Sequence, residues 1–190
     1  MRVPVPLRHA YRLLNHGPTT LVSTAAGDRR NVMAAAWVMP LDFEPPRFAA
    51  VVAADTWTRE LLAASGECVL HAPTDAQLDL VWAVGSRSGR DGDKFTALGI
   101  ATEPASLVAA PLVAGCAAWL ECRVVPEPAQ QDAYDLFVLE CTAAWADDAL
   151  WQDGEWRFSP GSPRTIHHLT GGVFFTTGER LAAAREKRAT

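Results

Sequence analysis

The sequence predicts a mainly β fold with peripheral helices, arranged as a small antiparallel barrel. Six apolar, strand-like segments are separated by short turns. Two or three helical segments interrupt them without regular strand–helix alternation, which argues against a doubly wound parallel sheet. With 190 residues, 49% of them hydrophobic, the chain can bury a core without disulfides or metals. We therefore expect residues 1–190 to form a single domain.

The first part of the chain predicts one helix and three strands. Apolar side chains at helical spacing predict a short helix over residues 7–15, ended by a Gly-Pro pair. Residues 19–26 and 31–38, joined by a polar turn at 27–30, predict a hairpin. After two prolines, residues 47–54 are apolar throughout, which predicts a strand buried on both faces.

The middle of the chain alternates helical and extended patterns. Residues 55–66 predict a helix capped by a threonine or an aspartate and ended by glycine, and residues 67–72 a fourth strand. Thr74 and Gln77 have the spacing of a capping box, which predicts a helix through Val84. The polar, glycine-rich stretch 85–94 is long for a loop in a compact domain, so it is a candidate functional loop.

The last part predicts a strand pair, a hairpin and a terminal helix. Residues 116–125 and 134–145 read as two longer strands joined by a proline-containing turn. Residues 151–158, around an Asp-Gly pair, predict a small hairpin. The charged, amphipathic residues 179–188 predict a helix.

Charge and composition exclude several classes of protein. The net charge is −5, and no stripe of lysine and arginine could neutralise a nucleic-acid backbone. No apolar run is long enough to cross a bilayer, and the first residues lack the apolar stretch of a secretory signal. We expect a cytoplasmic protein with neither a nucleic-acid nor a membrane partner.

Motifs for common enzyme classes are missing from the sequence. It contains no phosphate-binding glycine motif of the Rossmann or P-loop type, no G-x-S-x-G and no H-E-x-x-H. The five histidines lack the spacing of metal ligands, so we expect no metal site. The four cysteines form no C-x-x-C pair and are expected to be buried free thiols.

One loop and one helix start carry groups suited to a phosphate. The loop combines glycines and hydroxyls with Arg87, Arg90 and Lys94, although an ordinary solvated loop has the same composition. Thr56 and Thr58 stand at the start of the helix expected over 55–66, where exposed N–H groups and the helix dipole attract anions. Simple helix caps are the alternative for these threonines.

In segment order, the chain resembles the flavin reductase and flavoredoxin family over nearly its whole length. Four pieces carry the resemblance: NVMAAAWVMP at 31–40, the two prolines followed by DTWTRE at 55–60, SGRDGDKF at 88–95, and 111–121 with the Leu-Glu-Cys that ends this segment. The resemblance implies an FMN-binding split β-barrel with antiparallel Greek-key topology. It also implies a homodimer with the flavin near the subunit interface.

Carried over by position, the family's cofactor contacts fall on fifteen residues. The resemblance places Asn31 and the backbone of residues 33–36 along the isoalloxazine ring, with Trp37 beside the flavin or its ribityl chain. It places Thr56 and Thr58 at the phosphate or ribityl hydroxyls. The loop 88–95 would surround the phosphate, with Phe95 as its apolar floor. His168, the candidate catalytic residue, and Phe174 would approach the ring from the partner or from the same subunit. The full set is Asn31, Met33, Ala34, Ala35, Ala36, Trp37, Thr56, Thr58, Ser88, Gly89, Arg90, Lys94, Phe95, His168 and Phe174.

The function implied is that of a flavin-dependent oxidoreductase. Bound FMN would take hydride from NADH or NADPH and pass electrons to free flavin or to a protein acceptor such as a monooxygenase. The alternatives are a non-enzymatic FMN electron carrier of the flavoredoxin kind and a homodimer of the same fold without flavin. Seven tryptophans, many for this length, favour a buried interface between two copies.

Overall fold

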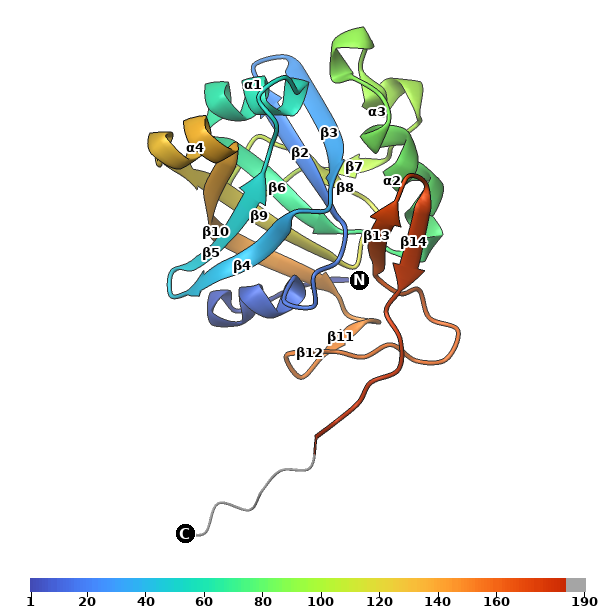
Figure 1. Cartoon of the computed structure of the whole chain (residues 1–190). Coiled ribbons are helices and arrows are strands. Elements are labelled where there is room, and N and C mark those ends of the chain that lie inside the picture. Colours follow the sequence, from blue (N-terminus) through green and yellow to red (C-terminus); the bar gives the residue numbers. More distant parts are fainter. Residues whose placement is uncertain (184–190) are drawn as a thin grey trace.

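The computed structural model describes residues 1–183, which form a mainly antiparallel β structure with few helices (Figure 1). This confirms the mainly β, antiparallel part of the predicted fold class. One sheet has the strand order β3-β2-β6-β9-β10-β5-β4, and β1 also pairs with β10. Its strands are β1 (Arg2–Pro4), β2 (Thr20–Ala26), β3 (Arg29–Ala35), β4 (Val38–Phe43), β5 (Pro46–Val51), β6 (Glu67–Ala72), β9 (Ala118–Val125) and β10 (Leu136–Asp147).

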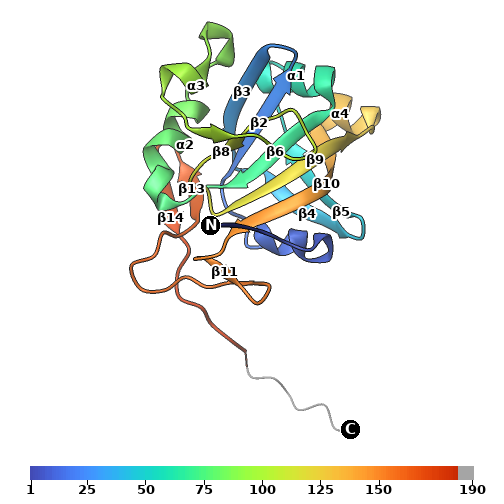
Figure 2. The same ribbon diagram turned by 180° about the vertical axis from the view of Figure 1, so that it is seen from behind.

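Short elements surround this sheet (Figures 1 and 2). The helices are η1 (Leu7–Leu13), α1 (Trp57–Ser65), η2 (Asp75–Gln77), α2 (Leu78–Gly85), η3 (Gly89–Asp91), α3 (Lys94–Ala97) and α4 (Pro128–Tyr134). Three two-stranded ladders complete the described chain: β7 (Thr102–Glu103) with β8 (Leu112–Val113), β11 (Trp151–Gln152) with β12 (Glu155–Trp156), and β13 (Ile166–Thr170) with β14 (Val173–Thr176).

The sheet curls because its two end strands are neighbours in the chain. Strands β3 and β4 stand at opposite ends of the strand order, yet only Ala36 and Trp37 separate them. Three residue steps span at most about 11 Å, so the two edges must meet at this corner. One hydrophobic cluster, with Phe48, Leu120 and Phe137, fills the inside of the curl.

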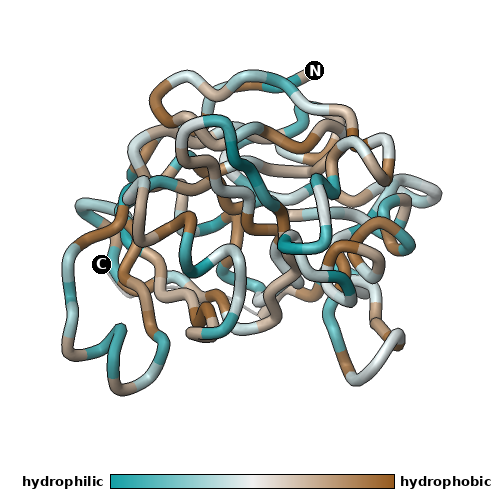
Figure 3. Tube along the Cα trace, turned by 90° about the horizontal axis from the view of Figure 1, so that it is seen from above, coloured by the Kyte–Doolittle hydropathy of each residue, from teal (hydrophilic) through white to brown (hydrophobic). Residues whose placement is uncertain are grey.

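A second hydrophobic cluster fastens the helices to the outside of the sheet. It joins Val81 and Val84 of α2 and Phe95 of α3 to Val32 on β3 and Trp119 on β9. Figure 3 shows that apolar residues are not confined to the interior, since brown segments also appear at the periphery. This second cluster fixes α2 and α3 against β3.

Several predicted boundaries are confirmed, and the caps explain why. Helix α1 begins after Thr56, whose hydroxyl accepts the Arg59 N–H at 3.2 Å, and it ends at Gly66 with φ of +69°. The small hairpin β11–β12 occupies the predicted place. All four cysteines are buried and free, as predicted, and burial raises the pKa of Cys116 to about 12.

Other predicted elements are wrong in type or length. Residues 7–13 form a 3₁₀ helix. The strand expected over 31–38 ends at Ala35, and after a two-residue corner β4 begins at Val38 as a separate strand. The capping box does not form: the Thr74 side chain makes no cap bond, and Thr74 instead bridges to Thr165. The turn before β10 contains the helix α4.

The C-terminal part also departs from expectation. The hairpin β13–β14 was not predicted, because its polar strands lack strict alternation. Of the helix expected over 179–188, residues 179–183 have no regular structure, and 184–188 lie outside the described residues. Within residues 1–183, every helix is too short or too polar to span a bilayer.

Candidate functional site

Two adjoining cavities lie where β3 meets α1, α2 and the hairpin β13–β14. The first, here called the α1 cavity, has a volume of about 300 Å³ and includes the start of α1. The second, called the hairpin cavity, has about 190 Å³ and includes side chains of β13 and β14. Ala34 and Gly85 line both cavities, so the two adjoin.

The α1 cavity brings together eight of the fifteen predicted residues, although they come from four separate segments. Arg87, the α1 residue Trp57 and Asp55 also line it. The eight are Asn31, Met33, Ala34, Thr56, Thr58, Ser88, Gly89 and Lys94.

The start of α1 offers main-chain donors to this cavity. The N–H groups in the first turn of a helix have no intrahelical acceptor and carry the positive end of the helix dipole. Thr56 satisfies the Arg59 N–H, while Trp57 and Thr58 line the cavity. Thr56 can therefore cap the helix and also line the cavity. The nearby Asp55 carboxylate limits the positive potential at this helix start.

Lys94 is a buried cation at the floor of the α1 cavity. It is 5% exposed, and its Nζ donates to the main-chain oxygens of Val32 at 2.9 Å and of Val84 at 2.8 Å. Burial lowers the pKa of Lys94 to about 8, so the side chain is mostly charged at pH 7. An ammonium has three donors. Lys94 thus ties β3 to α2 and keeps one N–H for a ligand.

Asn31 supplies an acceptor that the protein leaves unused. Its Nδ2 donates to Thr58 Oγ1 at 2.8 Å, while its Oδ1 is buried without a hydrogen-bond partner among the described residues. Buried polar atoms are rarely left unpaired, and a donor on a bound ligand would satisfy this one. Gly89 lies directly against Asn31, so the loop approaches β3 as closely as a backbone can.

Arg90 points away from the cavity it was expected to line. Its Nη1 pairs with Glu60 at 2.7 Å, and its guanidinium lies 5.1 Å from the Trp57 ring. Arg29 covers the same ring at 5.2 Å and also pairs with Glu60. Arg90 therefore helps to clamp Trp57, and Arg87 is the loop arginine that reaches the cavity.

The hairpin cavity gathers five predicted residues, namely Ala34, Ala35, Ala36, His168 and Phe174. The short side chains of the alanines project little into the cavity. The His168 and Phe174 rings meet edge to face at 5.2 Å, and His168 Nε2 lies 2.9 Å from the Gly171 oxygen. Trp82 and Thr19 line the cavity as well. Sequence reasoning missed both, although an exposed tryptophan on an amphipathic helix is a signal for Trp82.

Besides Arg90, two predicted residues line neither cavity. Phe95 is 2% exposed and belongs to the core cluster around α2, with the Arg30 guanidinium 4.6 Å from its ring. It therefore packs within the core and does not line the α1 cavity. Trp37 is 74% exposed at the β3–β4 corner. Within residues 1–183, no group of His, Cys, Asp and Glu could hold a metal ion.

A family model and a curated relative both match most of the chain. Residues 12–159 match the family described as flavin reductase like domain. The chain is 46% identical over 184 residues to the uncharacterized protein YddH of Escherichia coli, covering 95% of this chain and 97% of that protein.

Solved structures are similar as well. An FMN-binding domain of a flavin reductases-like enzyme from Shewanella baltica is 44% identical, with a TM-score of 0.94 and coverage of 97% of this chain and 98% of that one. The flavoredoxin of Desulfovibrio vulgaris is 26% identical, with a TM-score of 0.75 and coverage of 88% and 90%. The chain belongs to the flavin reductase-like family.

Proposed function

We propose that the protein is an FMN-dependent oxidoreductase of the split-barrel type that uses NADH or NADPH. The observation that carries the proposal is that the α1 and hairpin cavities adjoin along β3. The relative from Shewanella baltica, described as FMN-binding, supports the choice of cofactor.

The residues present fit a flavin phosphate at one end of the site. The start of α1, Ser88, Arg87 and the remaining N–H of Lys94 offer donors and positive charge within the α1 cavity. The unpaired Oδ1 of Asn31 would accept a hydrogen bond from a ribityl hydroxyl. In this proposal Asn31 and Met33 belong to the ribityl or phosphate end and not to the ring.

The hairpin cavity suits the apolar ring end. Its small alanines allow a planar group to lie against β3, while His168 and Phe174 would border that group from the hairpin. When bound, FMN would supply the hydride-accepting and electron-transferring chemistry. The chain's own residues bind and orient the cofactor, and its core excludes water from one side of the site.

The exposed face of β4 supports assembly with a second copy. Four large apolar side chains alternate along this edge strand and its preceding corner: Trp37, Met39, Leu41 and Phe43, each more than half exposed. Such a stripe on an edge strand invites pairing or burial. A homodimer through the β4 stripe would bury Trp37 next to the ring end of the site.

Absorbance and anaerobic stopped-flow test the proposal together. We expect the purified full chain to bind FMN with a flavin absorbance spectrum, and NADH or NADPH to bleach it. Reduction by dithionite but by neither nucleotide would overturn the reductase assignment in favour of an electron carrier. A chain that binds no FMN at micromolar concentration would overturn the cofactor assignment itself.

A further inference from the structure

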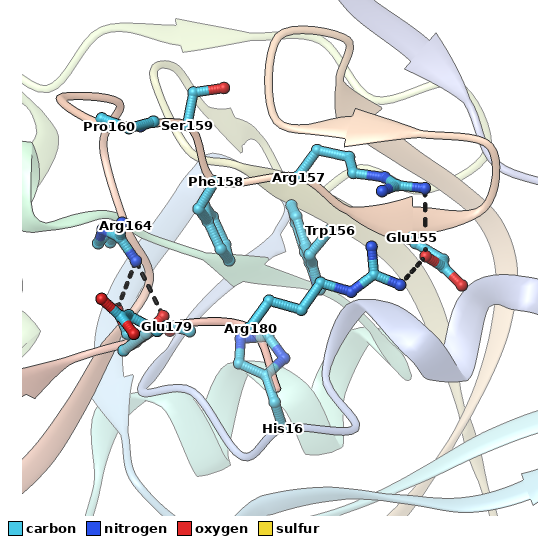
Figure 4. A pocket seen from close by; sticks show the side chains of 12 residues that line it. His16, Glu155, Trp156, Arg157, Phe158, Ser159, Pro160, Arg164, Glu179 and Arg180 are labelled. Atoms are coloured by element: carbon cyan, nitrogen blue, oxygen red, sulfur yellow. Dashed lines mark hydrogen bonds and ion pairs between the residues drawn. The ribbon is translucent and has the colours of Figure 1, made fainter. Parts of the chain in front are cut away.

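A third cavity, larger than the other two, is lined by β12 and by the segments just before and after the hairpin β13–β14 (Figure 4). Its volume is about 660 Å³, within the range of small-molecule sites. It shares no lining residue with the α1 or hairpin cavity, so the flavin proposal does not account for it. We call it the arginine cavity.

Three arginines give this cavity a net positive lining. Arg157 and Arg180 both pair with Glu155, at 3.4 and 2.8 Å. Arg164 forms no ion pair within residues 1–183; its Nη1 instead donates to the main-chain oxygens of Thr177 at 3.0 Å and of Gly178 at 2.9 Å. Glu179 also lines the cavity, so three cations face two carboxylates.

The Arg164 guanidinium is preorganised for an anion. Its two bonds to carbonyl oxygens fix the planar group beside the cavity without neutralising its charge, and the residue is partly buried. Three of the five guanidinium N–H groups are not used in these bonds. A partly buried arginine held in this way can bind carboxylate or phosphate with two parallel hydrogen bonds.

Aromatic rings form the neighbouring wall. Trp156 and Phe158 are stacked, with centroids 5.5 Å apart and planes 11° from parallel, and Figure 4 shows both between Arg164 and the Arg157–Glu155 pair. Trp151 supports Trp156 edge to face at 5.1 Å. This rigid wall offers a surface on which a planar ring can stack, one of the arrangements that aromatic groups prefer.

His16 closes the inner end of the cavity as a neutral side chain. Its Nε2 lies 2.8 Å from Thr165 Oγ1, and burial, with a smaller contribution from His167, lowers the pKa of His16 to about 4. The positive charge therefore lies on the arginine side and the apolar surface beside it. A ligand that matches both has a ring and an anionic substituent on the same molecule.

We propose that the arginine cavity binds a planar aromatic group that carries an anion, with the ring against Trp156 and Phe158 and the anion on Arg164. The same chemistry is found in an adenine nucleotide and in an aromatic carboxylate. The test therefore uses one probe of each kind, namely adenosine 2′,5′-bisphosphate and 4-hydroxybenzoate.

Calorimetric titration of the full chain, with and without saturating FMN, measures this binding. We expect at least one probe to bind equally well in both conditions, because FMN would occupy different cavities. Adenosine, which lacks the anion, and inorganic phosphate, which lacks the ring, should bind at least roughly tenfold more weakly. The site is thereby tested even if the chain binds no FMN.

Three variants locate the site, and a fourth is the matched control. We expect weaker binding of the probe to each of Arg164→Gln, Arg157→Gln and Phe158→Leu. For Arg164→Gln the affinity should fall roughly tenfold or more. Arg123→Gln, which removes the same charge from a surface ion pair on β9, should leave binding unchanged. If Arg164→Gln does not fold, the other two variants decide.

Clear outcomes would overturn the proposal. These are failure of both probes to bind, equal binding of adenosine, or binding that neither Arg157→Gln nor Phe158→Leu weakens relative to Arg123→Gln. Binding of the bisphosphate alone would assign the cavity to a nucleotide, and binding of the benzoate alone to an aromatic acid.

Discussion

Gly89 lies so close to Asn31 that a methyl group on Gly89 would overlap the Asn31 Oδ1 atom and come within 2.6 Å of Trp57 Cδ1. Neither neighbour can move easily. Asn31 is held by Thr58, and Trp57 is clamped between Arg29 and Arg90. The absence of a side chain at this one position therefore sets the shape of the α1 cavity.

Gly89→Ala should accordingly destabilise the fold and weaken flavin binding. Overpacking of this kind typically costs about 1–3 kcal/mol. The matched control is Gly178→Ala, because a Cβ there meets open space and no positive φ is required. Thermal unfolding and FMN titration of both variants test the prediction, and equal results for the two would contradict it.

Lys94→Ala should separate phosphate binding from ring binding. Loss of a charged hydrogen bond costs about 1.5–3 kcal/mol, so the FMN dissociation constant should rise roughly 10- to 150-fold. Riboflavin, which lacks the phosphate, should lose much less affinity. Fluorescence titration with both flavins measures the difference. Equal losses would mean that Lys94 acts only by joining β3 to α2 through Val32 and Val84.

The preference for FMN over riboflavin should depend on pH in one direction. Burial lowers the pKa of Lys94 to about 8, so deprotonation removes its charge as the pH rises through that value. The FMN preference should therefore be greater at pH 7 than at pH 9. Titrations at the two pH values check this. An unchanged preference would assign the phosphate contact to Arg87, which stays charged.

A charge in the β4 stripe should prevent assembly of two copies. Leu41 and Leu107 are both 51% exposed, but only Leu41 belongs to the stripe. We expect Leu41→Arg to convert a dimer of about 40 kDa into a monomer in light scattering, because a desolvated unpaired charge is costly at an interface. Leu107→Arg is the control and should remain dimeric. A wild-type monomer, or dimers of both variants, would rule out this interface.

His71 should make the fold sensitive to acid. It is fully buried, with Nδ1 3.1 Å from the Leu21 oxygen and Nε2 accepting the Val113 N–H at 3.0 Å, and burial lowers the pKa of His71 to about 4. Between pH 6.5 and 4 the unfolded chain takes up a proton that the folded chain does not. The free energy of unfolding should therefore fall by about 3 kcal/mol as pH decreases through this window.

Urea unfolding at several pH values measures this dependence. His71→Asn should have a shallower pH slope than the wild type, and His16, whose pKa is lowered in the same direction, should account for part of what remains. Identical slopes for the variant and the wild type would show that His71 is not the group responsible.

The fold could be predicted largely because local patterns coincide with the tertiary structure. The hairpin β2–β3, the capped helix α1 and the strand pair β9–β10 all have short-range signals. Strand β4 has no such signal, because its exposed side chains are apolar and a proline lies within it. The 3₁₀ geometry at 7–13 also lies beyond a spacing argument, since both helix types repeat with similar periods.

The candidate site was predictable in membership but not in orientation. Loop composition pointed to Arg87, Arg90 and Lys94 together, and only the tertiary structure shows Arg90 turned towards Glu60. The burial of Phe95 and the contribution of Trp82 to the hairpin cavity likewise depend on how α2 and α3 pack. Side-chain direction is set by such packing, which no single segment encodes.

Strand β10 pairs with β5, β9 and β1, whose sequences lie before it. Within residues 1–183, strand pairing therefore joins the β4–β5 end of the sheet to the other strands through β10. During synthesis, neither the curl nor its core can be completed until residue 147 has left the ribosome, although the β2–β3 hairpin can form much earlier. The edges of β5 and β9 that pair with β10 therefore stay exposed on the nascent chain until about three quarters of it has been made.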